Sequence, residues 1–265
     1  CGSIESPALL LRSGIGGPAA GQNLHLHPCT AVGGQYEDDT RAWWGAPQAA
    51  LVDEFVNVDD GYGFLIESTQ YATGTAAAAT PFTSGADHKQ AMSELRFGGT
   101  FIGLVRDHGA GQVTIDEAGQ AVPWYSLTDP RDVHNSHLAL DAQVRLHVAA
   151  GARRIVALAE GVPEWRVGDD VDRYVQRLQR VPLGAGGFRL FAAHQMGTCR
   201  MGADPQTSVA NPRGELHDTP GVWIGDASAF PTSSGTNPMI TIMALAHRTG
   251  EAIVAGSPAT ATATA

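Results

Sequence analysis

Short apolar runs alternate with polar and glycine-rich stretches along most of the chain, a pattern typical of a mixed α/β protein without repeats. Runs rich in β-branched and aromatic residues predict five strands, at 49–58, 62–71, 99–106, 112–116 and 154–159. The third and fourth runs flank RDHGAGQ, a short polar connection that contains glycines. This arrangement predicts that the two strands form an antiparallel hairpin.

Three helices are predicted before the C-terminal region. Ser6 is expected to cap, Pro7 to begin and Gly14 to end a compact helix near the N-terminus. A longer helix is expected from Asp129 and Pro130 toward residue 150, where Gly151 ends it, and another from about 169 to 179. Helical spacing predicts that the longer helix turns one stripe inward: Val133, His137, Leu140, Val144 and Val148.

The segment from 221 to 253 reads as a short apolar strand, a polar turn, a loop and a helix. Asn237 suits the N-cap position and Pro238 the first helical position, where its missing N–H costs nothing. Apolar residues then fall close to one face and predict a largely buried helix: Met239, Ile242, Met243, Ala246 and Ile253. A helix start held in this way stabilises an anion by about 0.3–2 kcal/mol.

Composition narrows the class of protein. The chain has 265 residues, 43% hydrophobic and 17% charged, as expected for a globular protein of one large or two small domains. A net charge of −10 argues against binding to nucleic acid or to anionic membrane surfaces. Three cysteines without C-x-x-C spacing suggest neither a disulfide framework nor a structural zinc site. The stretch at 73–80 and the final SPATATATA are expected to be flexible.

Three motifs near the C-terminus resemble one enzyme family. HQMGTCRMG at 194–202, GDAS at 225–228 and SGTNPM at 234–239 are similar to the C-terminal end of the glucose-methanol-choline (GMC) oxidoreductases, flavoproteins that oxidise alcohols. SPALLLRSGIG at 6–16 and GQNLHLHP at 21–28 resemble two further family motifs in the same order. Several matches in register are far more specific than any one of them.

The form of some motifs resembles one branch of this family. NLHLHP, RDHGAGQV at 106–113 and AAGARRI at 149–155 look most like the long-chain fatty alcohol oxidases. The resemblance implies an α/β protein: an α+β substrate-binding domain with an antiparallel sheet, and remnants of a Rossmann-like FAD-binding domain. The implied parts are an FAD-domain remnant at 1–28, the substrate-binding domain at 29–215, a returning FAD-domain segment at 216–254 and a flexible tail at 255–265.

One element of the family is missing from the sequence. No G-x-G-x-x-G turn, which would hold the FAD pyrophosphate, is found among the 265 residues. We therefore expect the chain to be the C-terminal part of a larger flavoenzyme, inactive without an N-terminal FAD-binding half in the same polypeptide or in trans. A non-catalytic binding or scaffolding module derived from this domain is the alternative.

The resemblance assigns the chemistry to two residues. His194 is implied to be the base over the flavin, and an imidazole has a pKa suited to taking the hydroxyl proton of an alcohol near neutrality. The substrate carbon would give hydride to flavin N5. Asn237 is implied to contact the substrate oxygen, and it can still cap the helix because the cap uses its carbonyl and leaves its amide N–H groups free.

The resemblance also implies which residues approach FAD. Asp226 is expected near the ribityl chain, with Gly225 and Ala227 leaving room for the cofactor. Asn23 belongs to a loop expected near the flavin, and the helix start at Pro238 and Met239 is expected to face its ring.

Three further residues, His25, His27 and Cys199, allow other interpretations. His25 and His27 form an H-x-H pair of the kind found in some metal sites, but no third ligand is identified. Cys199 is interpreted as packing, because no neighbour that would activate a thiol is evident. The exact alcohol and the electron acceptor, oxygen or another, stay open.

Overall fold

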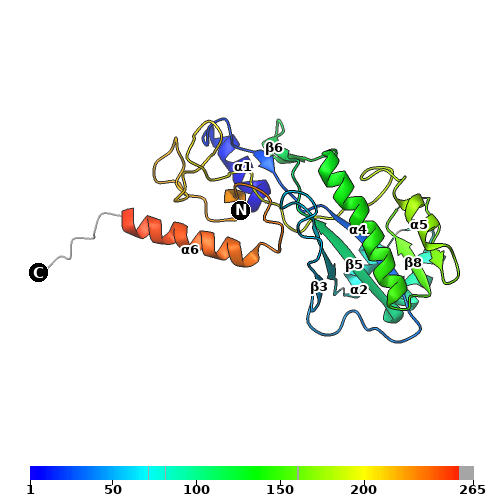
Figure 1. The fold of residues 1–265 in the computed structure, drawn as a ribbon. Coiled ribbons are helices and arrows are strands. Elements are labelled where there is room, and N and C mark those ends of the chain that lie inside the picture. The colour runs from blue at the N-terminus through cyan, green and yellow to red at the C-terminus, as the bar shows by residue number, and fades with distance from the viewer. Residues whose placement is uncertain (71, 81, 160, 257–265) are drawn as a thin grey trace, which may run out of the picture. The chain divides into compact units, whose positions relative to one another are not determined.

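The computed structural model describes residues 1–70, 72–80, 82–159 and 161–256. The chain divides into two compact units. The first unit consists of Cys1–Leu26, Ala110–Ser126 and the chain from Ala193 onward, and the second consists of His27–Gly109 and Leu127–Ala192. Helices and antiparallel sheets are mixed in sequence order, which confirms the predicted α/β class (Figure 1). Among the described residues, no helix is both long and apolar enough to cross a bilayer.

The second unit is built on a six-stranded antiparallel sheet in the order β3-β4-β5-β2-β8-β9. Its strands are β2 (Cys29–Gln35), β3 (Leu51–Val52), β4 (Phe64–Ser68), β5 (Gly98–Val105), β8 (Arg154–Ala157) and β9 (Trp165–Arg166). In the centre of the sheet, Val32 of β2 lies opposite Phe101 of β5 and Ala157 of β8. The remaining helical elements of this unit are α2 (Thr73–Ala79), α3 (Gly85–Ser93), η1 (Leu95–Phe97), α4 (Pro130–Ala149) and α5 (Val171–Leu178).

The helix predicted from Asp129 and Pro130 toward residue 150 is confirmed as α4, and it packs on this sheet (Figure 1). The Asp129 carboxylate caps it by accepting hydrogen bonds from the N–H groups of Arg131 and Asp132, and Gly151 ends it with φ 82°. Its buried face differs from the predicted stripe, since Val133, His137 and Val148 are only partly buried. The fully buried positions include Leu140 and Val144 but also several polar side chains: Asp132, Asn135, Ser136, Gln143 and His147.

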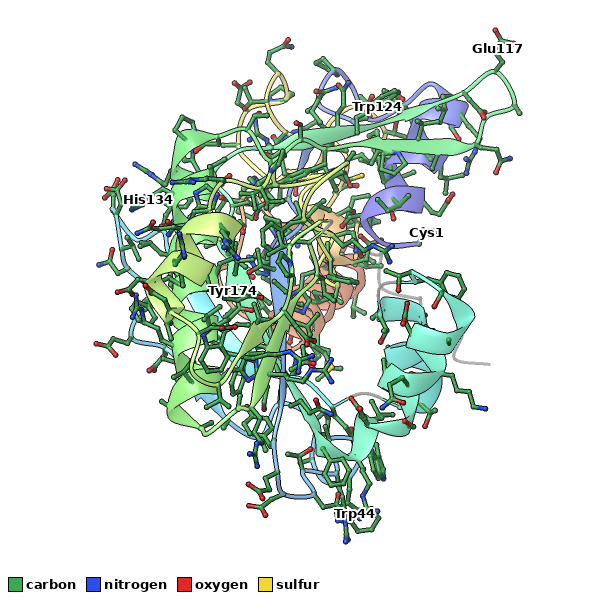
Figure 2. The ribbon with its side chains drawn as sticks, turned by 90° about the vertical axis from the view of Figure 1, so that its right-hand side faces the viewer. Cys1, Trp44, Glu117, Trp124, His134 and Tyr174 are labelled. Carbon is green, nitrogen blue, oxygen red and sulfur yellow. The ribbon has the colours of Figure 1, made fainter. Side chains whose placement is uncertain are left out.

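Helix α5 also agrees with its prediction. Asp170 caps it through the N–H of Arg173, and Tyr174, Val175 and Leu178 are buried in one cluster with Ile155 of β8. Figure 2 shows Tyr174 on the side of α5 that faces the sheet, and its hydroxyl donates to the Ile155 carbonyl at 3.3 Å.

The first unit contains a smaller sheet and the two ends of the described chain. Its strands β1 (Gln22–Leu24), β6 (Gly111–Ile115) and β7 (Ala121–Trp124) are antiparallel in the order β1-β6-β7. Strands β6 and β7 form a hairpin with Glu117 at its tip (Figure 2). The helical elements are α1 (Gly2–Ser13), the short 3-10 helix η2 (Ala227–Ala229) and α6 (Met239–Gly256).

The predicted hairpin around RDHGAGQ is wrong, although both of its strands exist. Both edges of β5 are already paired, with β2 and β4, so β6 has no place beside it and pairs with β1 and β7 instead. The connection is held at His108 and Gly109, whose N–H groups each donate to an Asp132 carboxylate oxygen at 2.8 Å.

Helix α1 begins earlier than predicted, at Gly2, with Pro7 inside it. Pro7 has no N–H to donate to the Ser3 carbonyl, which would break the helix if that carbonyl found no partner. The Thr198 hydroxyl donates to it at 2.7 Å. Ser6 is therefore not a cap, and only the predicted end at Gly14, with φ 66°, is confirmed.

Helix α6 differs from its prediction in two ways. It begins at Met239, one residue late, so that Pro238 supplies the first carbonyl of the helix, to the Ile242 N–H at 2.8 Å. The predicted burial is wrong: Thr249 and Ala252 are its buried residues, whereas Met239 and Met243 are 61% and 58% exposed. The apolar face exists, but the described part of the chain does not cover it.

Three further local predictions have mixed outcomes. Residues 99–106, 112–116 and 154–159 are confirmed as β5, β6 and β8, and 62–71 contains β4, with residue 71 outside the described part. In 49–58 only β3 forms, because polar side chains such as Asn57, which accepts the Gly61 N–H, favour turns. The stretch at 73–80, expected to be flexible, forms helix α2 over Thr73–Ala79, as suits its alanines. The expected tail lies almost entirely outside the described residues.

Candidate active site

The HQMGTCRMG segment runs between two other motifs within the first unit. On one side, the Gly21 N–H donates to the Thr198 carbonyl, and His25 and Met196 exchange both backbone hydrogen bonds, each at 2.9 Å. On the other side, three of its N–H groups donate to the successive carbonyls of η2, which contains the end of the GDAS motif: Gly197 to Ala227 at 3.1 Å, Cys199 to Ser228 at 2.8 Å and Met201 to Ala229 at 2.9 Å. Motifs distant in sequence are thus joined by backbone hydrogen bonds.

Helix α1 fixes the start of the same segment. The Ser3 hydroxyl donates to the Gln195 carbonyl at 2.8 Å, and Thr198 returns a bond to Ser3. Sequence reasoning did not identify Ser3 or Thr198, because each acts through a partner about 190 residues away and no local pattern marks such a pair. Their effect is to hold the backbone immediately after His194.

His194 itself is half-buried. Burial lowers the pKa of its imidazole below the ordinary 6.5, because desolvation disfavours the charged ring. The ring is therefore neutral near pH 7 and can accept a proton. A neutral imidazole on a segment held from both sides has the properties required of a general base.

Asp226 is held by hydrogen bonds from within the chain. Its Oδ1 accepts from the Ser228 N–H at 2.8 Å and the Ser228 hydroxyl at 2.6 Å, and its Oδ2 accepts from the Ser6 hydroxyl at 2.5 Å and the Gly2 N–H at 3.1 Å. Burial alone would raise the pKa of Asp226, but the hydrogen bonds from Ser228 and Ser6 outweigh it and lower the pKa below 3.8. The carboxylate is thus charged and ties η2 to α1.

Gly225 and Ala227, which flank Asp226, differ in their exposure to solvent. Gly225 is exposed, and a Cβ placed there would meet no atom within 4 Å. Ala227 is partly buried, and its carbonyl is used by Gly197. The backbone at Gly225 is therefore the open part of this turn.

Asn23 lies in β1 with φ 67°. Its side-chain Nδ2 donates to the carbonyls of Gly197 at 3.4 Å and Pro231 at 3.3 Å, while its Oδ1 accepts from Arg200 at 3.2 Å. Gly197 has φ 93°, and a Cβ there would lie 2.5 Å from the Asn23 carbonyl oxygen. This close approach explains why glycine occupies the position.

The residues before and after the start of α6 differ in exposure. Pro238 is buried and Asn237 is half-buried, whereas Met239 and Ile240 are more than half exposed. The helix start is therefore anchored and has an accessible apolar surface. These are the local properties expected of a helix that faces a flat ring.

The alternative readings can be compared with the structure. Among the described residues, no three His, Cys, Asp or Glu side chains are arranged to hold a metal ion. His25 and His27 are both buried. Cys199 is buried in an apolar cluster, which confirms its packing role, and burial raises the pKa of its thiol to about 12.

Comparisons with known proteins agree on a single family. A profile described as GMC oxidoreductase matches residues 107–246, and a second with the same description matches residues 1–29. The chain is 35% identical over 255 residues to an uncharacterised GMC-type oxidoreductase of Mycobacterium tuberculosis, covering 96% of this chain and 39% of that protein. It is 29% identical over 267 residues to a long-chain-alcohol oxidase of Arabidopsis thaliana, covering 96% of this chain and 36% of that one.

Solved structures support the fold. Pyridoxine 4-oxidase from Mesorbium loti superposes with a TM-score of 0.65 at 18% identity, over 97% of this chain and 51% of the other. A formate oxidase of Aspergillus oryzae gives a TM-score of 0.66 at 16% identity, over 96% and 53%. The chain therefore spans between about a third and a half of the length of the proteins it matches.

Proposed function

Since the chain belongs to the GMC oxidoreductase family, whose cofactor is FAD, we propose that it is the C-terminal part of an FAD-dependent alcohol oxidoreductase. Its substrate would be a primary alcohol, and a long-chain one is favoured because the plant relatives of this chain are named long-chain-alcohol oxidases. The observation that carries the proposal is the backbone pairing of the HQMGTCRMG segment with the β1 region and the GDAS turn.

The residues present fit the flavin ring better than the phosphates. The open backbone at Gly225, beside Ala227, and the exposed Met239 at the start of α6, after the buried Pro238, could accept a flat ring. Asp226 could accept a hydrogen bond from a ribityl hydroxyl only if one of its present hydrogen bonds within the chain were broken. A glycine-rich turn for the pyrophosphate is not in the sequence, so FAD binding would depend on an N-terminal half.

In the proposed reaction, FAD supplies the acceptor for the hydride that leaves the alcohol carbon. His194 accepts the hydroxyl proton on a ring nitrogen that burial keeps unprotonated. Asn237, on the loop before α6, orients the alcohol oxygen through its amide group. Ser3 and Thr198 keep the backbone beside His194 in place during proton transfer.

Reconstitution tests this proposal. The chain would be combined, fused or in trans, with the FAD-binding half of the mycobacterial relative, and the flavin absorbance would be followed anaerobically after addition of 1-dodecanol. We expect alcohol-dependent bleaching with both parts and neither tight FAD binding nor bleaching with the 265 residues alone. Stoichiometric FAD binding and reduction by the chain alone would contradict the fragment interpretation.

One observation favours a second candidate function. Each carboxylate oxygen of Asp226 already accepts two hydrogen bonds from the chain, which leaves little capacity for a cofactor hydroxyl. A non-catalytic binding module would keep this arrangement. It would show no bleaching with any FAD-binding half, and substitution of His194 would not change its binding properties.

A further inference from the structure

We infer that Asn23 is a positioning residue for the proposed reaction: its amide ties the segment that carries His194 to the segment that leads to Asn237. This role differs from the direct cofactor contact implied by the family resemblance. The catalytic consequence of this inference rests on the proposed function. The hydrogen bonds of the Asn23 amide do not depend on it.

The first step of the argument is the use of the Asn23 side chain. An asparagine amide has two N–H donors, and here one reaches the Gly197 carbonyl and the other the Pro231 carbonyl. The Oδ1 acceptor takes a hydrogen bond from Arg200, whose Nε donates to the Thr207 carbonyl. Both donors are thus engaged within the chain, which leaves neither for a cofactor without breaking a bond.

The second step is the position of its partners. Gly197 lies three residues after His194, and Pro231 lies six residues before Asn237. Backbone hydrogen bonds on both sides of Asn23, from Gly21 to Thr198 and between His25 and Met196, already align β1 with the HQMGTCRMG segment. Pro231 has no N–H to donate, so it cannot extend this pairing as a donor. The Asn23 amide therefore supplies a link to Pro231 that the backbone bonds do not.

The third step is the backbone conformation of Asn23. Its φ of 67° lies in the left-handed region, where asparagine is tolerated better than most residues but glycine better still. If only the turn mattered, glycine would serve equally well. Asparagine at this position satisfies the backbone and also places an amide between the two segments.

The test uses the 265-residue chain and three variants of it. Asn23→Gly keeps the backbone conformation accessible and removes the amide. Asn23→Asp keeps the acceptor for Arg200 but sets a carboxylate oxygen against the carbonyls of Gly197 and Pro231. Gln22→Ala, at the exposed neighbouring position of β1, is the matched control for the wild-type chain.

Hydrogen exchange and histidine titration by NMR would be measured in each form. We expect Asn23→Gly and Asn23→Asp to speed exchange of the Gly197 and Cys199 amides by about tenfold, because exchange follows local opening. The His194 pKa should rise toward 6.5 as its segment loosens, while that of His147 in the other unit should stay constant. Gln22→Ala should change neither.

The outcomes separate the positioning role from its alternatives. Unchanged amide exchange together with an unchanged His194 pKa in Asn23→Gly would overturn the inference. A shift of the His147 pKa as large as that of His194 would also overturn it, because it would indicate general destabilisation. In the reconstituted flavoprotein, Asn23→Gly should slow flavin reduction by 1-dodecanol at unchanged FAD affinity. Weaker FAD binding with an unchanged reduction rate would restore the cofactor-contact role. Loss of bleaching in the wild-type protein would refute the proposed function while leaving the exchange result intact.

Discussion

The two long helices of the chain, α4 and α6, differ in how much of their surface is covered. Helix α4 has 20 residues and buries both apolar and polar side chains against its sheet. Helix α6 has 18 residues and is held on one side, where Arg248 donates to the Pro212 carbonyl and Thr249 to the Ile224 carbonyl. Its large apolar side chains are mostly exposed: Met239, Ile240, Met243, Ile253 and Val254.

The difference shows where each helix finds the surface that covers its apolar side chains. Helix α4 packs against the sheet of the second unit, which buries the predicted Leu140 and Val144 fully but leaves Val133 and Val148 only partly buried. Helix α6 has an apolar face that the first unit leaves open, and such faces on globular proteins commonly mark contact surfaces. In the proposed function, an FAD-binding half would cover this face.

The largest expected effect is a loss of core packing under α4. Leu140 is fully buried between the helix and the sheet, and Leu140→Ala should lower the free energy of unfolding by about 2–5 kcal/mol, because the removed side chain leaves a cavity. Urea unfolding of the purified chain would measure this change. A loss below 1 kcal/mol, roughly the cost of a minor core change, would contradict the packing described for α4.

The next effect concerns pH and the buried His147. Burial lowers the pKa of this histidine to about 4, and its ring nitrogens contact the Val32 carbonyl at 2.9 Å and the Tyr36 hydroxyl at 2.7 Å. The unfolded chain binds a proton at this residue below about pH 6.5, whereas the folded chain does so only near pH 4. Stability should therefore fall by about 3 kcal/mol as the pH drops through that window.

The His147→Gln variant serves as the control for this pH effect. Glutamine can donate to the Val32 carbonyl but cannot take up a proton, so the difference in unfolding free energy between the two proteins should shrink as the pH falls from about 6.5 to 4. Parallel pH profiles for the two proteins would show that His147 does not carry this dependence.

A smaller effect is expected at the start of α4. Asp129→Ala removes the side chain that accepts the Arg131 and Asp132 N–H groups, and should cost about 0.5–2 kcal/mol. Asp129→Asn should recover most of the loss, since asparagine caps about as well as aspartate. If both variants lose the same stability, the contact of the Asp129 carboxylate with His108 Nδ1 at 2.8 Å, rather than the cap, would be responsible.

The smallest effect on stability is expected on the exposed face of α6. Met243→Ser should change the free energy of unfolding by less than about 0.5 kcal/mol, because the side chain is already 58% exposed. The same change should reduce self-association of the chain in sedimentation experiments. A loss of several kcal/mol would mean that this face is covered in the chain and would remove the contrast with α4.

Local signals made some of these features predictable from the sequence. The Asp129-Pro130 start and the Gly151 end of α4 are signals that act within a few residues, and the helix follows them. The polar members of its buried face could not be predicted from local sequence. The buried Gln143, for example, donates a hydrogen bond to Thr30, 113 residues away. Helical periodicity alone treats such a residue as solvent-facing.

The candidate site shows the same limit. The family resemblance identified the motifs that contain His194 and Asp226, but not the contacts that organise them. The bond from Ser6 to Asp226 joins residues 220 positions apart, and it replaced the capping role that local sequence favoured for Ser6. The start of α1 was mispredicted for a related reason, since the Thr198 hydroxyl makes an internal Pro7 tolerable.

Single-turnover reduction of the reconstituted flavoprotein, with His194→Ala compared to the parent, tests the central claim most directly. His217→Ala is the matched control, because His217 contacts Ser208 at 2.9 Å in a separate loop. We expect His194→Ala to retain FAD and to slow reduction by 1-dodecanol by a factor of about 10²–10⁴, with loss of the ascending limb of the pH profile. Reduction at the parental rate in His194→Ala would contradict the account.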